Sequence, residues 1–146
     1  MPRVTFEVRT ALSPDKVIAM LTDFTDRRPD LWPMLEREFY KVHEASATSA
    51  IVEEGGPRRS GLWERVHYEW DKSGRVRWTI LESNAFAPGG YVEVLVRPAA
   101  GHGSLVKVEW SRTGVNPRGW ALAALVALTR GAVLRRKVYE QAFQRA

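Results

Sequence analysis

The stretch covering residues 62–82 constrains the fold more than any other part of the sequence. It contains two segments of alternating residues, LWERVHYEW and VRWTILESN, separated by a turn signal at Ser73-Gly74. Such segments form β-strands, and a connection this short makes them antiparallel neighbours. Four large aromatic residues lie on the pair: Trp63, Tyr68, Trp70 and Trp78. So much aromatic area on antiparallel strands predicts a walled apolar cavity, and the function would depend on what fills it.

Residue parity along the first strand places Glu64 and Tyr68 on the inward face. Successive side chains of a strand point to opposite faces, and the more apolar set is Leu62, Glu64, Val66, Tyr68 and Trp70. His67 belongs to the outward set, so an acid–base pair of Glu64 with His67 is disfavoured unless a bulge shifts the register. A carboxylate on an apolar wall is costly unless it is paired. We therefore interpret Glu64 either as a polar anchor for a ligand or as the structural partner of a buried donor.

Two further strands add aromatic candidates for the cavity wall. On the second strand the apolar parity set is Val76, Trp78, Ile80 and Glu82. On a later strand, Trp110 follows Val106 and Val108 and is also expected to point inward. The alternative for both tryptophans is packing in an ordinary core without any ligand.

The order of the predicted elements is strand, helix, helix, six strands and a long helix, which is an α+β architecture because helices do not alternate with strands. The strands are expected at about 3–9, 37–45, 48–54, 60–70, 75–83, 90–97 and 104–112. Ser13-Pro14-Asp15 predicts a helix that ends near Thr22, because it supplies an N-cap, a first-turn proline and an acidic residue. Pro29 and Pro33 bracket a short second helix or turn, and Asn116-Pro117 begins a final helix that runs to near Phe143.

The final helix carries two signals. Residues at helical spacing form one stripe: Trp120, Ala124, Ala127, Gly131, Leu134 and Val138. Its small central residues either leave unfilled volume against the sheet or permit close helix–sheet packing. Residues 120–128, WALAALVAL, are apolar all round but too few to span a bilayer. They predict contact on both sides, with loops of the same domain, a partner or a membrane surface.

Composition bounds the class of protein. A chain of 146 residues with 45% hydrophobic and 27% charged residues fits one domain, residues 1–146, with a sizeable core. It has no cysteine, and its three histidines lie in different segments, so we expect no disulfide, no metal site and no cofactor. The first residues lack the apolar run of a signal peptide, and we expect a cytoplasmic protein.

The net charge of +5 is concentrated at the C-terminal end. From Arg112 onward there are seven basic residues and one acidic residue, Glu140, so this segment carries +6 and the remainder −1. Such a segment attracts phosphates, anionic lipid or an acidic partner, or it is simply a solvated helix face. Transient membrane contact through residues 120–137 is one possibility. Nucleic acid is not expected as a partner, because buried aromatics leave no stacking platform.

With these residues placed, the chain resembles the START/SRPBCC superfamily, specifically its polyketide cyclase/dehydrase-like branch. The resemblance covers the whole chain and rests on an ordered combination of soft motifs. They are the Ser13-Pro14-Asp15 helix start, Arg28-Pro29 with Leu31-Trp32-Pro33, Trp63-Glu64-Arg65 with Tyr68-Glu69-Trp70, Ser83-Asn84, and the Ala/Leu-rich C-terminal helix. It implies a helix-grip fold, in which a curved seven-stranded antiparallel sheet wraps a long C-terminal helix and two short helices close one end. The sequence contains no recognisable catalytic motif, so it does not indicate a reaction.

The resemblance implies a hydrophobic small-molecule ligand, such as a lipid, a polyketide or an aromatic metabolite, held between the sheet and the C-terminal helix. We expect a cavity of roughly 300–1,000 Å³. Its predicted lining is Trp32, Glu64, Tyr68, Trp70, Trp78, Trp110, Trp120, Ala124, Ala127 and Gly131. Two alternatives stay open: a cyclase or dehydratase in which Glu64 or Tyr68 moves protons, and a lipid or quinone carrier that docks on anionic membrane.

Overall fold

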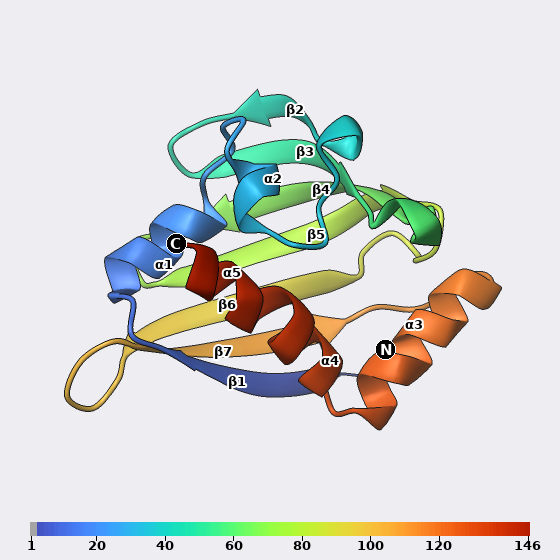
Figure 1. Ribbon diagram of the computed structural model, residues 1–146. Coiled ribbons are helices and arrows are strands. Elements are labelled where there is room, and N and C mark those ends of the chain that lie inside the picture. Colours follow the sequence, from blue (N-terminus) through green and yellow to red (C-terminus); the bar gives the residue numbers. More distant parts are fainter. Residues whose placement is uncertain (1–2) are drawn as a thin grey trace.

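The computed structural model describes residues 3–146, which contain a seven-stranded antiparallel sheet (Figure 1). The spatial order is β1-β7-β6-β5-β4-β3-β2, so the first strand pairs with the last and all other neighbours are consecutive. The strands are β1 (Val4–Thr10), β2 (Lys41–Ala45), β3 (Ser49–Gly55), β4 (Trp63–Trp70), β5 (Arg75–Ser83), β6 (Tyr91–Pro98) and β7 (Ser104–Ser111). The start predicted for the second strand was too early, because the 3-10 turn η1 (Arg37–Phe39) precedes β2.

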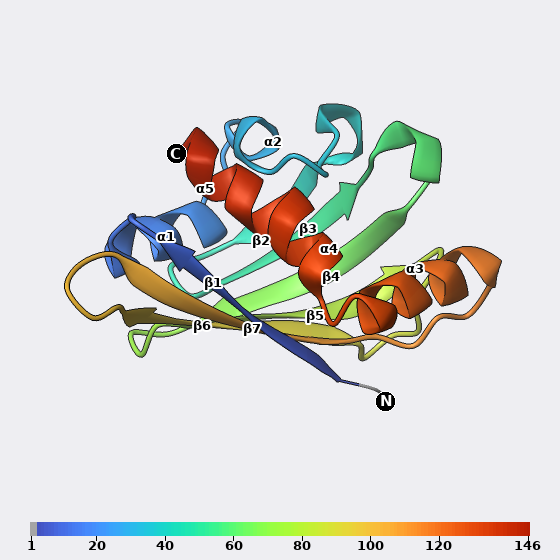
Figure 2. The same cartoon turned by 60° about the horizontal axis from the view of Figure 1, so that its bottom comes forward.

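The helices gather on one side of the sheet and at its ends. Two short helices, α1 (Pro14–Leu21) and α2 (Arg28–Leu31), follow β1, and the 3-10 turn η2 (Arg58–Ser60) joins β3 to β4. After β7 come α3 (Pro117–Leu128), α4 (Ala132–Leu134), the π-helical turn η3 (Arg135–Glu140) and α5 (Gln141–Arg145). Figures 1 and 2 show the run from α4 to α5 lying across one face of the sheet, with α1 at one end of the strands and α3 at the other. The predicted α+β class is confirmed.

Helix α1 begins where the sequence predicted. The Ser13 side chain accepts a hydrogen bond from the backbone N–H of Lys16 at 3.2 Å, and Pro14 occupies the first turn. The helix buries Val17, Met20 and Leu21, which lie at helical spacing on one face.

The sheet keeps the alternation that the sequence predicted on most strands. Phe6 and Val8 of β1 are buried, as are Val106 and Val108 of β7. The opposite face of the sheet carries charged residues, with ion pairs such as the one between Arg75 and Glu93. The hydrophobic core therefore lies on the face that the C-terminal helix covers.

A bulge on β5 reverses the orientation predicted for Glu82. Val66 pairs with Ile80 but Arg65 pairs with Glu82, so Leu81 is an extra residue on β5. Glu82 consequently lies on the outer face, where it forms an ion pair with Arg65 at 3.2 Å. Its predicted inward position was wrong because parity alone cannot detect a bulge.

The single long C-terminal helix predicted from Asn116 is broken between α3 and α4. Arg130 and Gly131 adopt positive φ values of 52° and 81°. The N–H of Gly131 donates to the carbonyl of Val126 at 2.8 Å, and the N–H of Arg130 donates to Ala127 at 3.1 Å. These two bonds form a Schellman motif, which ends a helix. The predicted stripe from Trp120 to Val138 therefore does not lie on one continuous helix.

Replacing Gly131 with alanine should destabilise the protein for two separable reasons. A Cβ atom at Gly131 would lie 2.3 Å from the Cδ1 atom of Phe6, and the positive φ disfavours any side chain. Gly89 is a matched control, because its φ is +90° but an added Cβ meets nothing within 4 Å. We expect Gly89→Ala to lose roughly 1–2 kcal/mol from backbone strain. Gly131→Ala should lose about 1–3 kcal/mol more from the clash. Urea unfolding measures both losses in stability. Equal losses in the two variants would show that the Phe6 ring moves aside without cost and would contradict the predicted clash.

Candidate functional site

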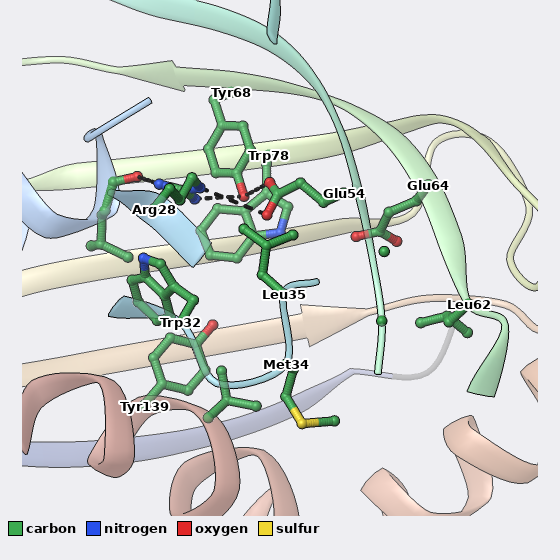
Figure 3. A pocket seen from close by; sticks show the side chains of 14 residues that line it. Arg28, Trp32, Met34, Leu35, Glu54, Leu62, Glu64, Tyr68, Trp78 and Tyr139 are labelled. Atoms are coloured by element: carbon green, nitrogen blue, oxygen red, sulfur yellow. Dashed lines mark hydrogen bonds and ion pairs between the residues drawn. The ribbon is translucent and has the colours of Figure 1, made fainter. Parts of the chain in front are cut away.

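A pocket of about 170 Å³ lies between the inward face of the sheet, the segment after α2 and the C-terminal helix (Figure 3). The sheet contributes Glu54, Glu64, Tyr68 and Trp78 to its lining. The segment after α2 contributes Met34 and Leu35, and η3 contributes Val138 and Tyr139. The pocket is smaller than the roughly 300–1,000 Å³ that the sequence interpretation predicted. Met34 is 40% exposed, so the pocket reaches the surface beside this side chain.

A buried arginine, Arg28, forms one wall of the pocket. Its side chain is only 3% exposed, and its Nη1 atom donates to the backbone carbonyls of Leu21 at 3.1 Å and Asp23 at 3.0 Å. Its Nη2 atom donates to the Tyr68 hydroxyl at 3.0 Å, and its Nε atom lies 3.7 Å from the Glu54 carboxylate. The guanidinium thus connects the α1–α2 segment to β3 and β4.

Aromatic rings surround the same guanidinium. The Cζ atom of Arg28 lies 4.5 Å from the ring centroid of Phe24, 5.1 Å from that of Tyr68 and 5.8 Å from that of Trp32. Cations are attracted to the faces of aromatic rings, more strongly where water is excluded. These rings and the Glu54 carboxylate therefore compensate for part of the solvation that Arg28 loses on burial.

Tyr68 is held in place from several directions. Its hydroxyl donates to Glu54 and accepts from Arg28, and its ring stacks on Trp78 with the centroids 5.0 Å apart. Burial, together with the nearby Glu54 carboxylate, raises the pKa of Tyr68 well above its usual range. The hydroxyl therefore keeps its proton at neutral pH and stays committed to Glu54.

Glu64 forms a second buried ion pair, with Arg112. The two guanidinium nitrogens of Arg112 donate to the two carboxylate oxygens of Glu64 at 2.7 and 3.1 Å. The Glu64 side chain is only 13% exposed and that of Arg112 only 7%. Burial raises the pKa of Glu64, although the Arg112 charge opposes that shift. The arginine itself lies over Phe86 at 5.3 Å and near Trp110 at 6.0 Å.

Tyr139 offers the pocket a polar group that the protein does not use. Its ring meets Trp32 edge to face at 5.8 Å, and Figure 3 shows its hydroxyl directed into the pocket. Within residues 3–146 this hydroxyl makes no hydrogen bond, although the side chain is only 5% exposed. Burial raises the pKa of Tyr139, so the hydroxyl is a protonated donor at neutral pH. The pocket therefore combines aromatic walls with this hydroxyl donor, and the buried indole N–H of Trp32 in the same lining also lacks a hydrogen-bond partner within residues 3–146.

The sequence profile of one family matches residues 1–142, and that family is described as polyketide cyclase / dehydrase and lipid transport. The chain belongs to this family. The resemblance to the START/SRPBCC superfamily inferred from the residues is thereby confirmed. No curated protein sequence matches the chain.

Several solved structures share the fold of this family member at low sequence identity. The protein TTHA0849 from Thermus thermophilus is 19% identical with a TM-score of 0.76, over 99% of this chain and 96% of that one. The Zhui aromatase/cyclase from Streptomyces sp. R1128 is 14% identical with a TM-score of 0.76, over 99% and 94%. A START superfamily protein from Mycobacterium smegmatis is 13% identical with a TM-score of 0.65, over 94% and 97%. At such identities the likeness establishes the helix-grip fold alone.

Four of the residues predicted to line the cavity of this family member are brought together in the pocket: Trp32, Glu64, Tyr68 and Trp78. Others lie elsewhere in the fold. Trp70 stacks on Phe24 with the centroids 5.8 Å apart, and Trp110 packs against Phe86 at 5.9 Å. The predicted places of these two residues in the pocket lining were therefore wrong, although both point to the inward side.

The predictions for the C-terminal helix also need correction. Trp120 is 59% exposed, and Ala124 and Ala127 lie on the exposed side of α3 rather than against the sheet. Gly131 is buried, but it packs against Phe6 and does not line the pocket. All four of these residues lie outside the pocket lining for the same reason: the turn at Arg130 and Gly131 ends the helix before it reaches the pocket.

Three important groups were not predicted from the sequence to belong to the site. Glu54 shares the parity of the buried Val52 on β3, which was a usable signal for an inward carboxylate. Arg28 and Arg112 gave no such signal, because their carboxylate partners lie 26 and 48 residues away in the chain. Only the fold brings these charges together.

Replacing Glu64 with glutamine should be strongly destabilising, because it leaves the buried Arg112 cation without its counter-charge. We expect Glu64→Gln to lower the free energy of unfolding by about 3–5 kcal/mol. The control is Glu82→Gln, which breaks the exposed ion pair with Arg65 and should cost less than about 1 kcal/mol. Chemical denaturation of the three proteins measures both effects. Similar small losses in the two variants would contradict a buried, tightly coupled pair.

Proposed function

We propose that the protein binds a small, uncharged, largely apolar molecule that carries one hydrogen-bond acceptor. The single observation that carries this proposal is the Tyr139 hydroxyl, which belongs to a buried side chain, points into a pocket walled by aromatic rings and has no hydrogen-bond partner in the described chain. Buried polar groups are usually hydrogen-bonded, and an unpaired one costs free energy. A ligand acceptor placed against Tyr139 would remove that cost.

The size of the pocket favours a ligand of about one aromatic ring inside the protein. An apolar cavity of about 150 Å³ accommodates benzene, and the volume here is about 170 Å³. A longer ligand would have to extend past Met34, where the lining is exposed. The aromatic walls, Trp32, Tyr68 and Trp78, suit a flat ring, because offset and edge-to-face contacts between rings are favourable.

The charges around the pocket favour an uncharged ligand. Arg28 is compensated by Glu54, and Arg112 by Glu64. A charged ligand would lose its own hydration without gaining a free counter-ion, which is costly in a low-dielectric site. Neutral apolar molecules with a carbonyl, ether or ester oxygen meet both requirements.

Binding alone accounts for the polar groups better than proton transfer does. Both carboxylate oxygens of Glu64 accept from Arg112, and the Tyr68 hydroxyl is committed to Glu54 and Arg28. A general acid or base must reach the reacting atom within hydrogen-bond distance. A cyclase or dehydratase mechanism through Glu64 or Tyr68 would first have to break these contacts.

The proposed role of Tyr139 predicts a specific loss of selectivity. Acetophenone and ethylbenzene have similar shapes, but only acetophenone carries an acceptor oxygen. The wild-type protein should bind acetophenone more tightly by about 0.5–1.5 kcal/mol, the net value of one hydrogen bond. Tyr139→Phe should remove this preference while ethylbenzene binding stays nearly unchanged. Titration followed by NMR chemical shifts measures both affinities.

The matched control for this titration is Tyr40→Phe. The Tyr40 hydroxyl donates to the Thr25 carbonyl at 3.1 Å and does not line the pocket. This variant should keep the wild-type preference for acetophenone. A preference that survives in Tyr139→Phe, or one that vanishes equally in Tyr40→Phe, would contradict the assigned role of Tyr139.

Filling the pocket should abolish binding without disturbing the fold. Val138 lines the pocket from η3 and is half-buried, so Val138→Phe would place a ring in the space that the ligand needs. Val115→Phe is the control, because Val115 is 52% exposed and lies outside the pocket lining. Native mass spectrometry after gentle purification should detect a bound small molecule in the wild type and in the control, but not in Val138→Phe. Equal retention in all three would place the ligand elsewhere.

A further inference from the structure

Helix α3 lies at one end of the molecule (Figures 1 and 2). It exposes an apolar face to solvent. Gly119 and Val126 are buried toward the protein, with Leu122 and Ala123 half-buried beside them. The opposite side consists of exposed apolar residues: Trp120, Ala121, Ala124, Leu125, Ala127 and Leu128. The fractional exposure is 59% for Trp120 and 85% for Leu128. No residue between 120 and 128 is polar.

Such a face is unusual on a helix that covers the end of a sheet. A surface helix ordinarily places polar and charged residues opposite its buried stripe, and a helix that is apolar all round is normally buried. Isolated exposed apolar residues need no explanation, but a contiguous exposed patch marks an interaction surface. The face of α3 therefore requires something that covers it.

The charged residues that flank α3 in the sequence are all positive. From residue 110 to residue 139 the chain contains no aspartate or glutamate. Arg118, Arg130, Arg136 and Lys137 are exposed, and none of them forms an ion pair with a residue in the range 3–146. A patch of apolar side chains bordered by unpaired cations is complementary to a partner with an apolar interior and a negatively charged outer layer.

We propose that α3 docks on an anionic lipid bilayer, lying in the plane of the interface. Leu125 and Leu128 would enter the acyl boundary, Trp120 would sit at the headgroup level, and the flanking arginines would contact lipid phosphates. The helix lies on the membrane rather than across it, because 12 residues extend only about 18 Å. No helix within residues 3–146 is long and apolar enough to cross a bilayer.

A second copy of the chain fits this face less well. In a two-fold dimer the same patch meets itself, so each cation that borders one α3 faces the cations that border the other. Because residues 110–139 contain no aspartate or glutamate, this segment would add like-charge repulsion to the contact and supply no compensating acidic partner. An anionic bilayer supplies both the apolar layer and the missing negative charge.

Docking through α3 would also bring one end of the pocket near the lipid headgroups. The Arg118 guanidinium packs against Gly61, close enough that a Cβ added to Gly61 would lie 3.3 Å from its Nη2 atom. Leu62, which follows Gly61 in the chain, lines the pocket. The docking surface itself contributes no residue to the pocket, so the two proposals can be tested independently.

Vesicle sedimentation tests the docking proposal. One set of vesicles contains phosphatidylcholine alone, and the other contains equal parts of phosphatidylcholine and phosphatidylglycerol. We expect binding to the anionic vesicles that weakens at high salt, because the exposed cations are screened there. Leu128→Glu should reduce this binding about tenfold or more, since it replaces an inserted side chain with a repelled one. Arg136→Gln and Lys137→Gln should each reduce it roughly fivefold.

The matched control is Leu81→Glu, because Leu81 is another exposed leucine, 39% exposed, that lies on the bulge of β5 and not on α3. It should bind vesicles like the wild type, and circular dichroism should show that all variants are folded. Absence of binding to anionic vesicles, binding that is insensitive to salt, or equal losses in Leu81→Glu and Leu128→Glu would overturn the proposal. A dimer in sedimentation velocity that Leu128→Glu dissociates would overturn it too, because a second copy would then cover the face.

Discussion

The buried guanidinium of Arg28 organises the half of the molecule that contains the pocket. Removing such a cation from water costs several kcal/mol, and a single ion pair rarely compensates for that loss. Here two backbone carbonyls, the Tyr68 hydroxyl, the Glu54 carboxylate and three aromatic rings share the task. Because these partners come from the α1–α2 segment, β3 and β4, the charge fixes how the short helices sit on the sheet. The pocket exists between elements that this one charge holds in place.

The two buried ion pairs then determine which surface of the pocket is left for a ligand. Glu54 compensates the charge of Arg28, and Glu64 compensates that of Arg112. Neither pair therefore offers an uncompensated charge to a ligand. Tyr68 is committed to the first of these pairs, which leaves the Tyr139 hydroxyl and the Trp32 indole N–H as uncharged side-chain donors of the lining without a hydrogen-bond partner in the described chain. Under the proposed function, such a pocket would recognise shape and a hydrogen-bond acceptor rather than charge. The same pairing gives the carboxylates of Glu54 and Glu64 and the hydroxyl of Tyr68 partners within the protein itself.

The sequence predicted those features that depend on local periodicity. Alternation placed Glu64, Tyr68 and Trp78 on the inward face, and Ser13-Pro14 placed the start of α1, because both patterns involve residues near one another in the chain. Features that depend on a special backbone conformation were missed. An extra residue at Leu81 turned Glu82 outward, and no alternation pattern contains that information. The partnership of Arg28 with Glu54 was missed as well, since pairing between distant segments is a property of the tertiary fold.

The break at Arg130 and Gly131 shows how one backbone position can shape two surfaces of this chain. A continuous helix would have aligned Trp120, Ala124 and Ala127 with Val138 along the sheet, as their spacing suggested. Gly131 adopts a positive φ and lies against Phe6 where a side chain would clash, so the chain turns and α4 begins in a new direction. Beyond the turn, Val138 and Tyr139 reach the pocket, while α3 stays at the end of the sheet with its apolar face outward. The small residues of α3 therefore do not enlarge the cavity; they form an exposed face with Leu125 and Leu128. Since this face is separated from the pocket by the turn, its apolar character cannot be a by-product of ligand enclosure and requires a contact of its own.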